Sequence, residues 1–449
     1  MDLLQKISGA GVVGEGGAGF PTHVKLDAKV EYLLVNALEC EPLLHTDKYI
    51  IRNFSAEIAS AIESVQEHIG AKQAIIGIKL VNATEIGILK QAISSRPNIS
   101  IFPMDNYYPA GDEQMLVFDT IGRVVPPGGL PIHVGAVVLN VGTLLDIKWA
   151  LEGRPVTHKY LSVSGEVANP SVLHAPIGTT FKECVEACGG SLISEFTVID
   201  GGPLMGKVME SEALSKRYVT KTTSGIILTQ RLRNFTERLA VPIPSVLNRA
   251  KSACIQCRLC TDLCPRYLIG HRLRPHRIMR AMAGVGQVSA NSAQILKEAL
   301  ICCECGICEA YACPMNLLPR QVNKYVKELL RKVGVGYEAD ALYPPHKVRE
   351  YRKISPYKLM ARMGLGGLMG RKADHFQELS PRQVTVPLKQ HIGKTAEAIV
   401  KEGEIVEVGQ LIGRCMGSIS ANVHASIKGT VTSVDNGFIT ISNQLEGGV

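Results

Sequence analysis

The chain has 449 residues, too long for one ordinary hydrophobic core, so we expect about three or more domains. An apolar fraction of 46% with 20% charged residues is typical of a folded globular protein. The net charge of +8 is spread over several segments without a recognition motif, so we expect a solvated basic surface and no nucleic-acid partner.

The N-terminal segment has Lys6 within its short apolar run and Glu15 soon after, unlike a secretory signal peptide. No stretch reaches the roughly 18–20 uninterrupted apolar residues that cross a bilayer. We therefore expect a cytoplasmic protein without a direct membrane span. In a reducing compartment, closely spaced cysteines are metal ligands more often than disulfides.

Residues 1 to about 155 alternate short apolar runs with helical patterns. The runs Tyr32–Val35 and Ala74–Ile78 predict buried strands, and Ala56–Ile69 and Glu85–Ser94 predict helices. Short buried strands between helices are typical of a mostly parallel sheet covered on both faces. We therefore expect an α/β domain here.

Four polar loops in this segment suit a nucleotide or flavin. The first is a glycine loop, in which bare backbone permits positive φ, close approach of a ligand and phosphate binding by N–H groups. Polar loops at the carboxyl ends of strands are where α/β sheets bind ligands. One such loop is equally well a surface turn, but four in one domain favour a pocket. They are Val13–Thr22, Asn36–Pro42, Tyr108–Glu113, and Asn140–Thr143 after the predicted strand Ala136–Leu139.

Residues 156 to 240 read as a small α+β module. One helix is predicted over Phe181–Ala187, and Gly189-Gly190 is a typical helix stop. The predicted strands around it are Tyr160–Val163, Thr197–Ile199 and Gly225–Leu228.

Residues 245 to 325 contain nine of the thirteen cysteines, in two runs. The first, from Cys254 to Pro265, has the C-x₂-C-x₂-C-x₃-C-P spacing of bacterial ferredoxins, in which the fourth cysteine binds the other cluster. The second run ends at Cys313-Pro314, with four residues instead of three before its last cysteine. We predict two [4Fe–4S] clusters, one on Cys254, Cys257, Cys260 and Cys313, the other on Cys302, Cys305, Cys308 and Cys264.

The remaining cysteines have simpler interpretations. Cys303 does not fit the ligand spacing, and we interpret it as a buried thiol beside a cluster. Cys184 and Cys188 lie one turn apart on a predicted helix and are interpreted as core residues. Two zinc sites are the alternative to clusters, but zinc ribbons use paired C-x₂-C units and not three cysteines in series before a Cys-Pro.

Residues 330 to 380 are rich in Lys, Arg, Pro and Gly and predict a poorly packed basic linker, disordered in part. Residues 383 to 449 show short β-like runs broken by glycines, which predict a compact all-β sandwich. Its predicted strands are Val384–Pro387, Glu397–Val400 and Phe438–Ile441.

The motifs GEGGAGFPTHVK, NALECEP, YPAGDE and NVGT resemble those of the NADH-oxidising flavoprotein subunit of respiratory complex I and its relative RnfC. The segment YLSVSGEVANPSVLHAPIGTTFKECVEACGG resembles the β-grasp SLBB module. VPLKQHIGKTAEAIVKEGEIVEVGQLIG resembles the barrel-sandwich domain that RnfC carries at its start. With the runs CRLCTDLCPRYLIGH and CCECGICEAYACP, this order is most similar to the cobalamin reductases of propanediol-utilisation microcompartments.

The resemblance implies sites for FMN and NADH. Glu15, Leu38 and Cys40 depart from the complex I pattern, which has Arg, an acid and Ser there. Because a carboxylate beside a phosphate is unfavourable, we expect Glu15 to point away from the flavin site. The implied cofactor-binding residues are Gly14, Gly16, Gly17, Gly19, Phe20, Lys25, Asn36, Glu39, Glu41, Tyr108, Gly111, Asp112, Glu113, Asn140 and Thr143, with Lys25 and Glu113 the catalytic candidates.

The implied function is an NADH-dependent oxidoreductase that passes electrons through FMN and two clusters to a corrinoid. A flavin suits this task because it accepts an electron pair and releases electrons singly. A corrinoid adenosyltransferase and microcompartment shell proteins are the implied partners, and the expected location is in or at that shell. The sequence has no Asp-x-His-x-x-Gly cobalamin motif, so we expect the corrin to bind weakly, at a cluster face, or on a partner.

Two alternatives stay open from the sequence. One is an RnfC-like subunit that reduces ferredoxin or another acceptor. The other is a non-enzymatic electron conduit through a microcompartment shell. Biotin and lipoyl carriers place a modified Lys on a hairpin tip of the barrel-sandwich domain. The corresponding segment here, Ser420–Ala425, has no Lys, so we interpret that domain as structural or docking.

Overall fold

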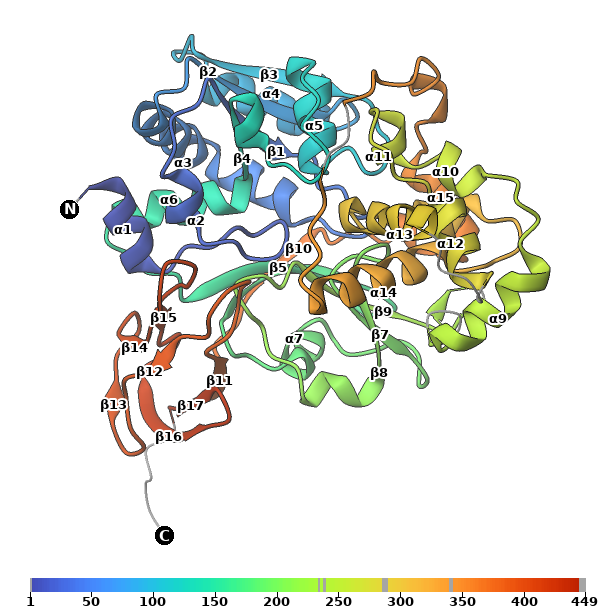
Figure 1. Ribbon diagram of the computed structural model, residues 1–449. Helices are drawn as coiled ribbons and strands as arrows, with labels where there is room; N and C mark the ends of the chain where they lie inside the picture. The colour runs from blue at the N-terminus through green and yellow to red at the C-terminus, as the bar shows by residue number, and fades with distance from the viewer. Residues whose placement is uncertain (1, 233–234, 237–239, 285–289, 339–341, 444–449) are drawn as a thin grey trace.

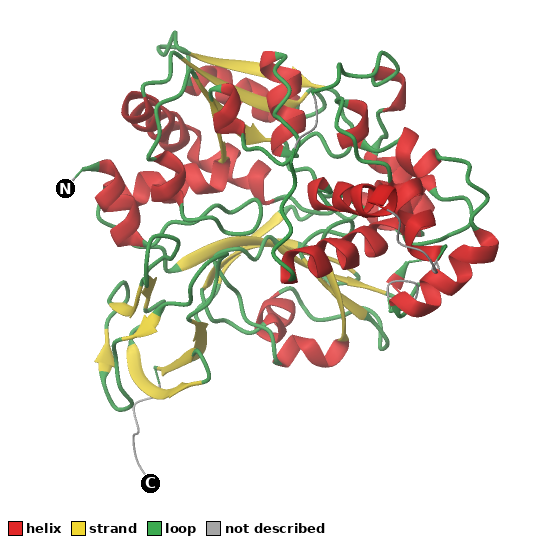
Figure 2. Ribbon diagram, viewed as in Figure 1, coloured by secondary structure: helices red, strands yellow, loops and turns green. Residues whose placement is uncertain are grey.

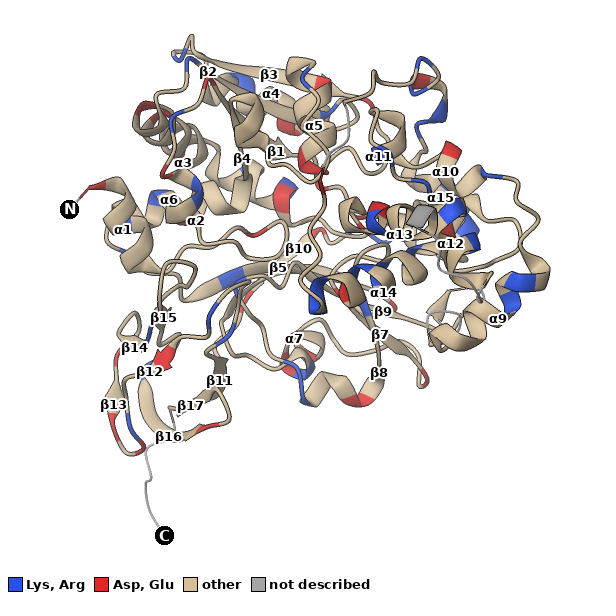
Figure 3. Cartoon of the chain, viewed as in Figure 1, with Lys and Arg blue, Asp and Glu red and all other residues tan. Residues whose placement is uncertain are grey.

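A computed structural model gives the fold (Figure 1). It describes residues 2–232, 235–236, 240–284, 290–338 and 342–443. Helices gather around the N-terminal sheet and in the cysteine-rich part, whereas the C-terminal domain consists of short strands and loops (Figure 2). Lys and Arg are distributed over all parts of the chain (Figure 3), as the sequence predicts.

The N-terminal domain is built on four parallel strands in the order β3-β2-β1-β4. Alternate residues of each strand enter two different cores, so both faces of the sheet are buried and the strands are apolar throughout. Helices α1, α3, α4 and α6 cover one face and α5 the other, which confirms the predicted α/β domain. The elements are α1 Leu3–Ala10, α2 Thr22–Leu26, β1 Tyr32–Ala37, α3 Thr46–Ile69, β2 Gln73–Lys79, α4 Ala83–Ala92, β3 Ile99–Met104, α5 Glu113–Ile121, β4 Ala136–Asn140 and α6 Val141–Leu151.

The second domain is a six-stranded mixed sheet in the order β10-β6-β5-β9-β7-β8. Helix α7 (Phe181–Ala187) packs on it and has the predicted bounds, because a Thr180–Glu183 capping box starts it and left-handed Gly189 and Gly190 follow its end. Cys184 and Cys188 are fully buried in this core, as expected. The strands are β5 His158–Gly165, β6 Ser171–Pro176, β7 Thr197–Asp200, β8 Lys207–Glu210, β9 Gly225–Thr229 and β10 His375–Glu378.

The cysteine-rich part is a set of short helices joined by cysteine loops. α12 packs on α9 and α14 around a core that also contains cysteines of both runs. The helices are α9 Ile243–Ala253, α10 Leu259–Asp262, α11 Pro265–Leu268, α12 Pro275–Ala283, α13 Ala290–Lys297 and α14 Pro319–Lys332.

The predicted basic linker contributes buried side chains between Arg349 and Ala373, so the expectation of poor packing is wrong for that part, whereas the described residues from 331 to 348 are exposed or half-buried. Helix α15 (Pro356–Met363) buries Leu359, Met360 and Met363 in a core shared with Tyr108. Strand β10 then joins the second domain as an edge strand parallel to β6. The abundance of Lys and Arg hid a short amphipathic helix whose apolar face joins the domains.

The C-terminal domain forms two small antiparallel sheets, β11-β17-β16-β13 and β12-β14-β15, which confirms the predicted all-β architecture. The strand predicted over Glu397–Val400 is shorter, because only β12 Glu397–Ala398 pairs. The other strands are β11 Gln383–Pro387, β13 Ile405–Val406, β14 Leu411–Arg414, β15 Val423–His424, β16 Gly429–Asp435 and β17 Phe438–Ser442.

The C-terminal domain contacts the N-terminal domain directly. Buried Lys221 of the second domain also bridges them, because its Nζ donates to the carbonyl oxygens of Gly11 and Asn422, both at 2.6 Å. Ile392 N donates to Ala18 O at 2.8 Å, so the glycine loop is tied to this domain. Asn422 belongs to the hairpin segment that carries the modified Lys in carrier domains, and here that segment makes an interdomain contact.

Among the described helices, none combines the length and apolar composition that crossing a membrane requires.

We predict that Met360→Ala lowers the free energy of unfolding by about 2–5 kcal/mol, because it opens a cavity at a fully buried position. Tyr351→Ala, at a residue that is 90% exposed in the same segment, is the control and should change stability by less than about 0.5 kcal/mol. Thermal or denaturant unfolding of the intact protein measures both. Equal, negligible effects would contradict the packed arrangement.

Candidate functional site

The glycine loop presents bare backbone to open space. It is closed by a hydrogen bond of 2.9 Å from Gly14 N to Phe20 O. A Cβ placed on Gly17 would meet no atom within 4 Å, and one on Gly16 would meet only Asn140. Within the described part of the chain, the N–H groups of Gly16, Gly17 and Gly19 donate to no partner. Unused donors around a space free of side chains fit a bound phosphate or flavin.

Positive φ accounts for only one glycine of this loop. Gly19 has φ of +71°, and a Cβ there would also press on Thr222 and His391. Gly14, Gly16 and Gly17 have no positive φ, so backbone conformation does not explain them, whereas a ligand in the open space beside Gly16 and Gly17 would.

The Asn140–Thr143 motif contacts the glycine loop directly. Thr143 Oγ1 accepts a hydrogen bond from Glu15 N at 3.0 Å. Asn140 caps α6, with Oδ1 accepting from Gly142 N at 2.8 Å. The first and fourth motifs therefore meet at the start of α6, where the helix dipole favours an anion.

The second and third motifs meet at the same edge of the sheet. Asn36, at the end of β1, donates from Nδ2 to Gly111 O at 2.9 Å. Asn140 Nδ2 lies 3.4 Å from Asn36 O, which links them to the fourth motif. A Cβ on Gly111 would lie 2.9 Å from the Cβ of Cys40, so close packing explains this glycine. All four loops thus converge at the carboxyl ends of β1 and β4, as α/β sheets predict.

Lys25 and Glu113 form an ion pair of 2.6 Å that joins α2 to the start of α5. Their side chains are 26% and 44% exposed. The two catalytic candidates from sequence are thus brought together at the rim of the site, where a soluble substrate can reach them.

Two buried carboxyl groups lie behind the sheet edge. Glu39 Oε1 accepts from Asp47 N at 2.9 Å, and Asp47 Oδ2 accepts from Asn140 at 3.1 Å. Burial raises the pKa of Glu39 and raises that of Asp47 to about 8, with repulsion between the two carboxyls adding to the latter. Glu39 Oε2 has no partner among the described residues. An unpaired buried oxygen at this edge of the sheet is a further feature that fits a ligand here.

Glu15 turns into the protein interior at the start of α6, and its orientation relative to a bound flavin stays a prediction. Its Oε2 pairs with buried Lys159 of β5 at 2.5 Å and lies against Gly142. Asp146 on α6 is fully buried next to this pair, and burial raises its pKa well above the usual range. Lys159 offsets the charge of the Glu15 carboxylate. The sequence did not indicate this ion pair, because Lys159 lies in the second domain, far from the glycine loop along the chain.

Glu41 and Tyr108 hydrogen-bond to the other domains, whereas Phe20 closes the glycine loop through its carbonyl oxygen. The Glu41 carboxylate accepts from the N–H groups of Leu204 and Met205 at 2.9 and 3.0 Å, and from Tyr108 OH at 3.2 Å. Burial raises the pKa of Glu41. Glu41 therefore anchors the second domain, and the Phe20 side chain is 37% exposed at the surface.

The thiols of the two cysteine runs fall into two groups. Cys313, from the second run, lines one small cavity with three cysteines of the first. Burial is the main cause that raises the pKa of Cys260 to about 12, and the other thiols of its group add to it. Cys264, from the first run, lies among cysteines of the second. The groups are Cys254, Cys257, Cys260 and Cys313, and Cys264, Cys302, Cys305 and Cys308.

This is the grouping that cross-ligation requires, and the donor set of four thiols per group fits a cubane. In the ranges that the structure describes, no three His, Cys, Asp or Glu side chains converge as ligands of one metal ion. A cubane does not need such convergence, because each thiolate binds a different iron. Iron binding by these eight cysteines stays a prediction.

The two cysteine loops have matching backbones. Gln256 and Glu304 precede the second ligand cysteine of each run, Cys257 and Cys305, with φ of +55° and +61°. Arg258 and Gly306 follow it, with φ of +66° and +81°. Left-handed non-glycine residues are costly and are kept only where the surroundings require them. Cys303 corresponds to Ile255 in this alignment, which supports its interpretation as a non-ligand.

The extra residue before Cys313 is absorbed locally. Cys308–Ala312 forms a π-helical turn, which accommodates one residue more than an α-helical turn. The turn lets Cys313 reach the first cysteine group despite its longer spacing.

The two cysteine groups differ in exposure. Cys264, Cys302, Cys305 and Cys308 are buried, whereas Cys257 is exposed and the rest of its group is partly exposed. Tyr108 OH donates to Cys305 O at 2.9 Å, and Arg266, two residues after Cys264, pairs with Asp112 at 2.7 Å. The buried group therefore lies against the Tyr108–Glu113 loop of the N-terminal domain. Arg266 directly follows the Cys-Pro of the first run, a signal that sequence reasoning left unused.

Family models match four parts of the chain. They describe the Nuo51 FMN-binding domain at residues 7–149, the SLBB domain at 160–207, a 4Fe-4S dicluster domain at 253–318 and the RnfC barrel sandwich hybrid domain at 373–448. Together with the converging loops and paired thiol groups, these domains define a flavin- and iron–sulfur-dependent oxidoreductase.

The chain is 38% identical to the cobalamin reductase PduS of Salmonella typhimurium, over 98% of this chain and 96% of that protein. The PduS of Citrobacter freundii gives the same identity, over 98% and 96%. The chain belongs to the PduS cobalamin reductase family. A component of the Na(+)-translocating ferredoxin:NAD(+) oxidoreductase complex of Acetobacterium woodii is 33% identical over 60% of this chain and 58% of that protein. A chain of an NAD+-reducing [NiFe]-hydrogenase crystal structure gives a TM-score of 0.48 at 19% identity, covering 76% of this chain and 68% of that one.

We predict that Gly17→Phe abolishes flavin binding while iron content is unchanged, because the ring fills the space beside the unused N–H groups. Flavin released by denaturation and iron per chain are the two measurements. Gly87→Phe, at an exposed position on α4, is the matched control and should retain flavin. Full flavin occupancy in the Gly17 variant would contradict the site.

We predict about eight irons per chain in wild type, about four after Cys257→Ser, and about eight after Cys303→Ser. The reason is that Cys257 is assigned to a cluster whereas Cys303 is not. Iron, acid-labile sulfide and electron paramagnetic resonance after dithionite reduction measure this, and flavin should remain in both variants. Loss of a cluster signal in Cys303→Ser would show that the cysteine assignment is wrong.

Proposed function

We propose that this protein is an NADH-dependent cobalamin reductase, which takes electron pairs from NADH and delivers single electrons to a corrinoid. The observation that carries the proposal is the junction between the glycine-loop site and the buried cysteine group, made by Tyr108–Cys305 and Arg266–Asp112. The relatives that match nearly the whole chain are named cobalamin reductases, which supports the choice of acceptor.

The residues of the N-terminal site suit FMN. The free N–H groups of Gly16, Gly17 and Gly19 would hold its phosphate, and Asn36 and Gly111 would flank it. When bound, FMN supplies the conversion from electron pairs to single electrons, and the clusters supply one-electron carriers.

The Lys25–Glu113 ion pair is the part of the site that a nicotinamide can approach. The pair is partly exposed, and Phe20 offers an apolar ring at 37% exposure on the same loop system. We assign Lys25 and Glu113 to positioning of NADH at the flavin. Glu41 is assigned to the interdomain junction and not to nucleotide binding, because its carboxylate oxygens already accept hydrogen bonds from Leu204, Met205 and Tyr108.

We further propose that the reduced corrinoid is passed to an adenosyltransferase and that the protein works in or at the shell of a bacterial microcompartment. Both points rest on the resemblance of the whole chain to cobalamin reductases of that kind.

The test is anaerobic reduction of cob(III)alamin and cob(II)alamin by NADH, followed by absorbance. We expect about two cob(II)alamin formed from cob(III)alamin per NADH, since NADH gives two electrons. Gly17→Phe should abolish the reaction, and Gly87→Phe should retain it. Preferential reduction of ferredoxin would favour an RnfC-like role. Clusters that dithionite reduces but NADH does not, with an unbleached flavin, would favour an electron conduit.

A further inference from the structure

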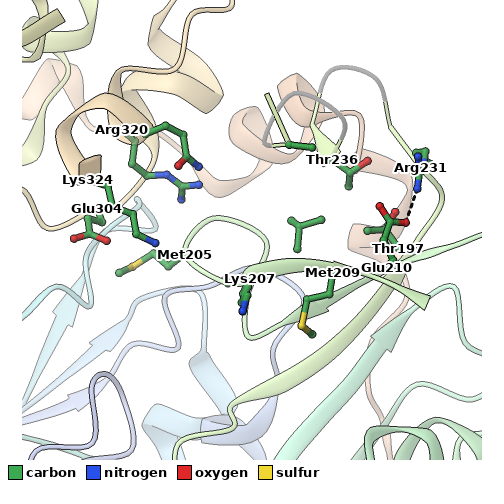
Figure 4. Close-up of a pocket in the computed structure, with 14 residues that line it drawn as sticks. Thr197, Met205, Lys207, Met209, Glu210, Arg231, Thr236, Glu304, Arg320 and Lys324 are labelled. Atoms are coloured by element: carbon green, nitrogen blue, oxygen red, sulfur yellow. Dashed lines mark hydrogen bonds and ion pairs between the residues drawn. The ribbon is translucent and has the colours of Figure 1, made fainter. Parts of the chain in front are cut away.

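A cleft of about 430 Å³ lies between the second domain and the cysteine-rich part (Figure 4). One wall is the loop and strand from Met205 to Glu210, with Thr197 of β7 beside it. The opposite wall is the first turns of α14, with Arg320 and Lys324, and Glu304 from the second cysteine run. This volume is in the usual range of small-molecule sites.

The cleft has more cations than acids among its described lining residues. Arg320 pairs with Glu309 outside the cleft at 2.7 Å, and Glu304 pairs with Lys327 at 2.9 Å. Lys207 and Lys324 make no ion pair with any described residue. Figure 4 shows Lys207 on one wall and Lys324 on the other. Two unpaired cations facing one space favour an anionic group of a ligand.

The remaining lining is mixed: Gln321, Thr236 and the Arg231–Glu210 ion pair are polar, whereas the Met205–Met209 wall supplies apolar side chains. Met205 is 55% exposed, and Val208 and Met209 continue the apolar wall. Thr197 is only 3% exposed, yet its Oγ1 has no hydrogen-bond partner among the described residues. Buried hydroxyls are normally paired, so this one is available to a polar group of a ligand. Methionine adapts to large ligands of irregular shape.

The cleft adjoins the buried cysteine group. Glu304 stands between Cys303 and Cys305, and Arg320 donates to Leu204 O beside Met205. A Cβ on Gly306 would come within 3.3 Å of Leu204 O, which directly precedes the Met205–Glu210 wall. The second cysteine run therefore packs directly against that wall. A molecule in this cleft would therefore lie against the segment that carries Cys302, Cys305 and Cys308.

We propose that this cleft binds the corrinoid acceptor. A cobalamin combines an apolar ring edge, several amide groups and one phosphodiester, which match the methionines, the Thr197 hydroxyl and the two unpaired lysines. The cleft is smaller than a whole cobalamin, so one edge of the molecule enters and the rest stays in solvent. The inference rests on the proposed function and adds to it the place where the acceptor binds.

The test is equilibrium dialysis of cyanocobalamin against fully loaded oxidised protein. In the double variant Lys207→Glu/Lys324→Glu we expect binding to weaken by roughly tenfold or more, through loss of contacts to the phosphodiester. Cobinamide, which lacks the phosphodiester, should bind wild type more weakly and be insensitive to the double variant. Lys401→Glu, an exposed lysine of the C-terminal domain, is the matched control and should bind like wild type. Flavin and iron contents should be unchanged in all variants.

Three outcomes are decisive. Cyanocobalamin binding that is equal in wild type and the double variant would overturn the cleft assignment and leave the reductase function standing. Displacement of cyanocobalamin by NADH, with the same sensitivity to the double variant, would identify a dinucleotide site and also overturn it. Wild-type protein that neither binds nor reduces cobalamin would instead overturn the proposed function.

Discussion

The whole arrangement depends on one junction, where the Tyr108–Glu113 loop of the sheet domain meets the second cysteine run. Tyr108 reaches the Cys305 carbonyl, and Asp112 pairs with Arg266. The Tyr108 contact is buried and the Arg266–Asp112 pair is largely so, and an unpaired charge or hydroxyl is costly there, so the two parts are held in a defined position. Electron transfer between a flavin and a cluster requires such a fixed approach. The junction supplies it without any shared secondary structure.

The linker and the C-terminal domain also hold the domains in position relative to one another. Helix α15 adds Leu359 and Met360 to the core around Tyr108, which stabilises the junction from its far side. The C-terminal domain is bound to the glycine loop through Ile392 and to Gly11 through Lys221. RnfC carries a similar domain at its start, and here it stands at the end of the chain. A domain that acts by tertiary contact can do so from either end of a sequence, provided that the contact surface is retained.

The two cysteine groups are unequal in a way that bears on electron flow. The buried group touches the sheet domain and borders the cleft at Glu304 and Arg320, whereas Cys257 of the other group is exposed. Cluster properties depend on burial and nearby hydrogen bonds, so the two groups offer different environments to chemically similar ligands. The two cysteine groups thus have similar backbone turns but differ in burial and in their neighbouring residues.

Local patterns in the sequence determined the cysteine runs, the glycine loop, the parallel sheet and the all-β C-terminal domain, because spacing, apolar periodicity and glycine content are properties of neighbouring residues. They did not reveal the inward Glu15–Lys159 pair, the role of Arg266 or the buried face of the linker, since these join residues far apart in the chain. Glu41 was assigned to the nucleotide from its motif, yet its carboxylate is occupied by backbone N–H groups of a different domain. Only the tertiary structure decided which polar groups face open space and which satisfy one another in an interface.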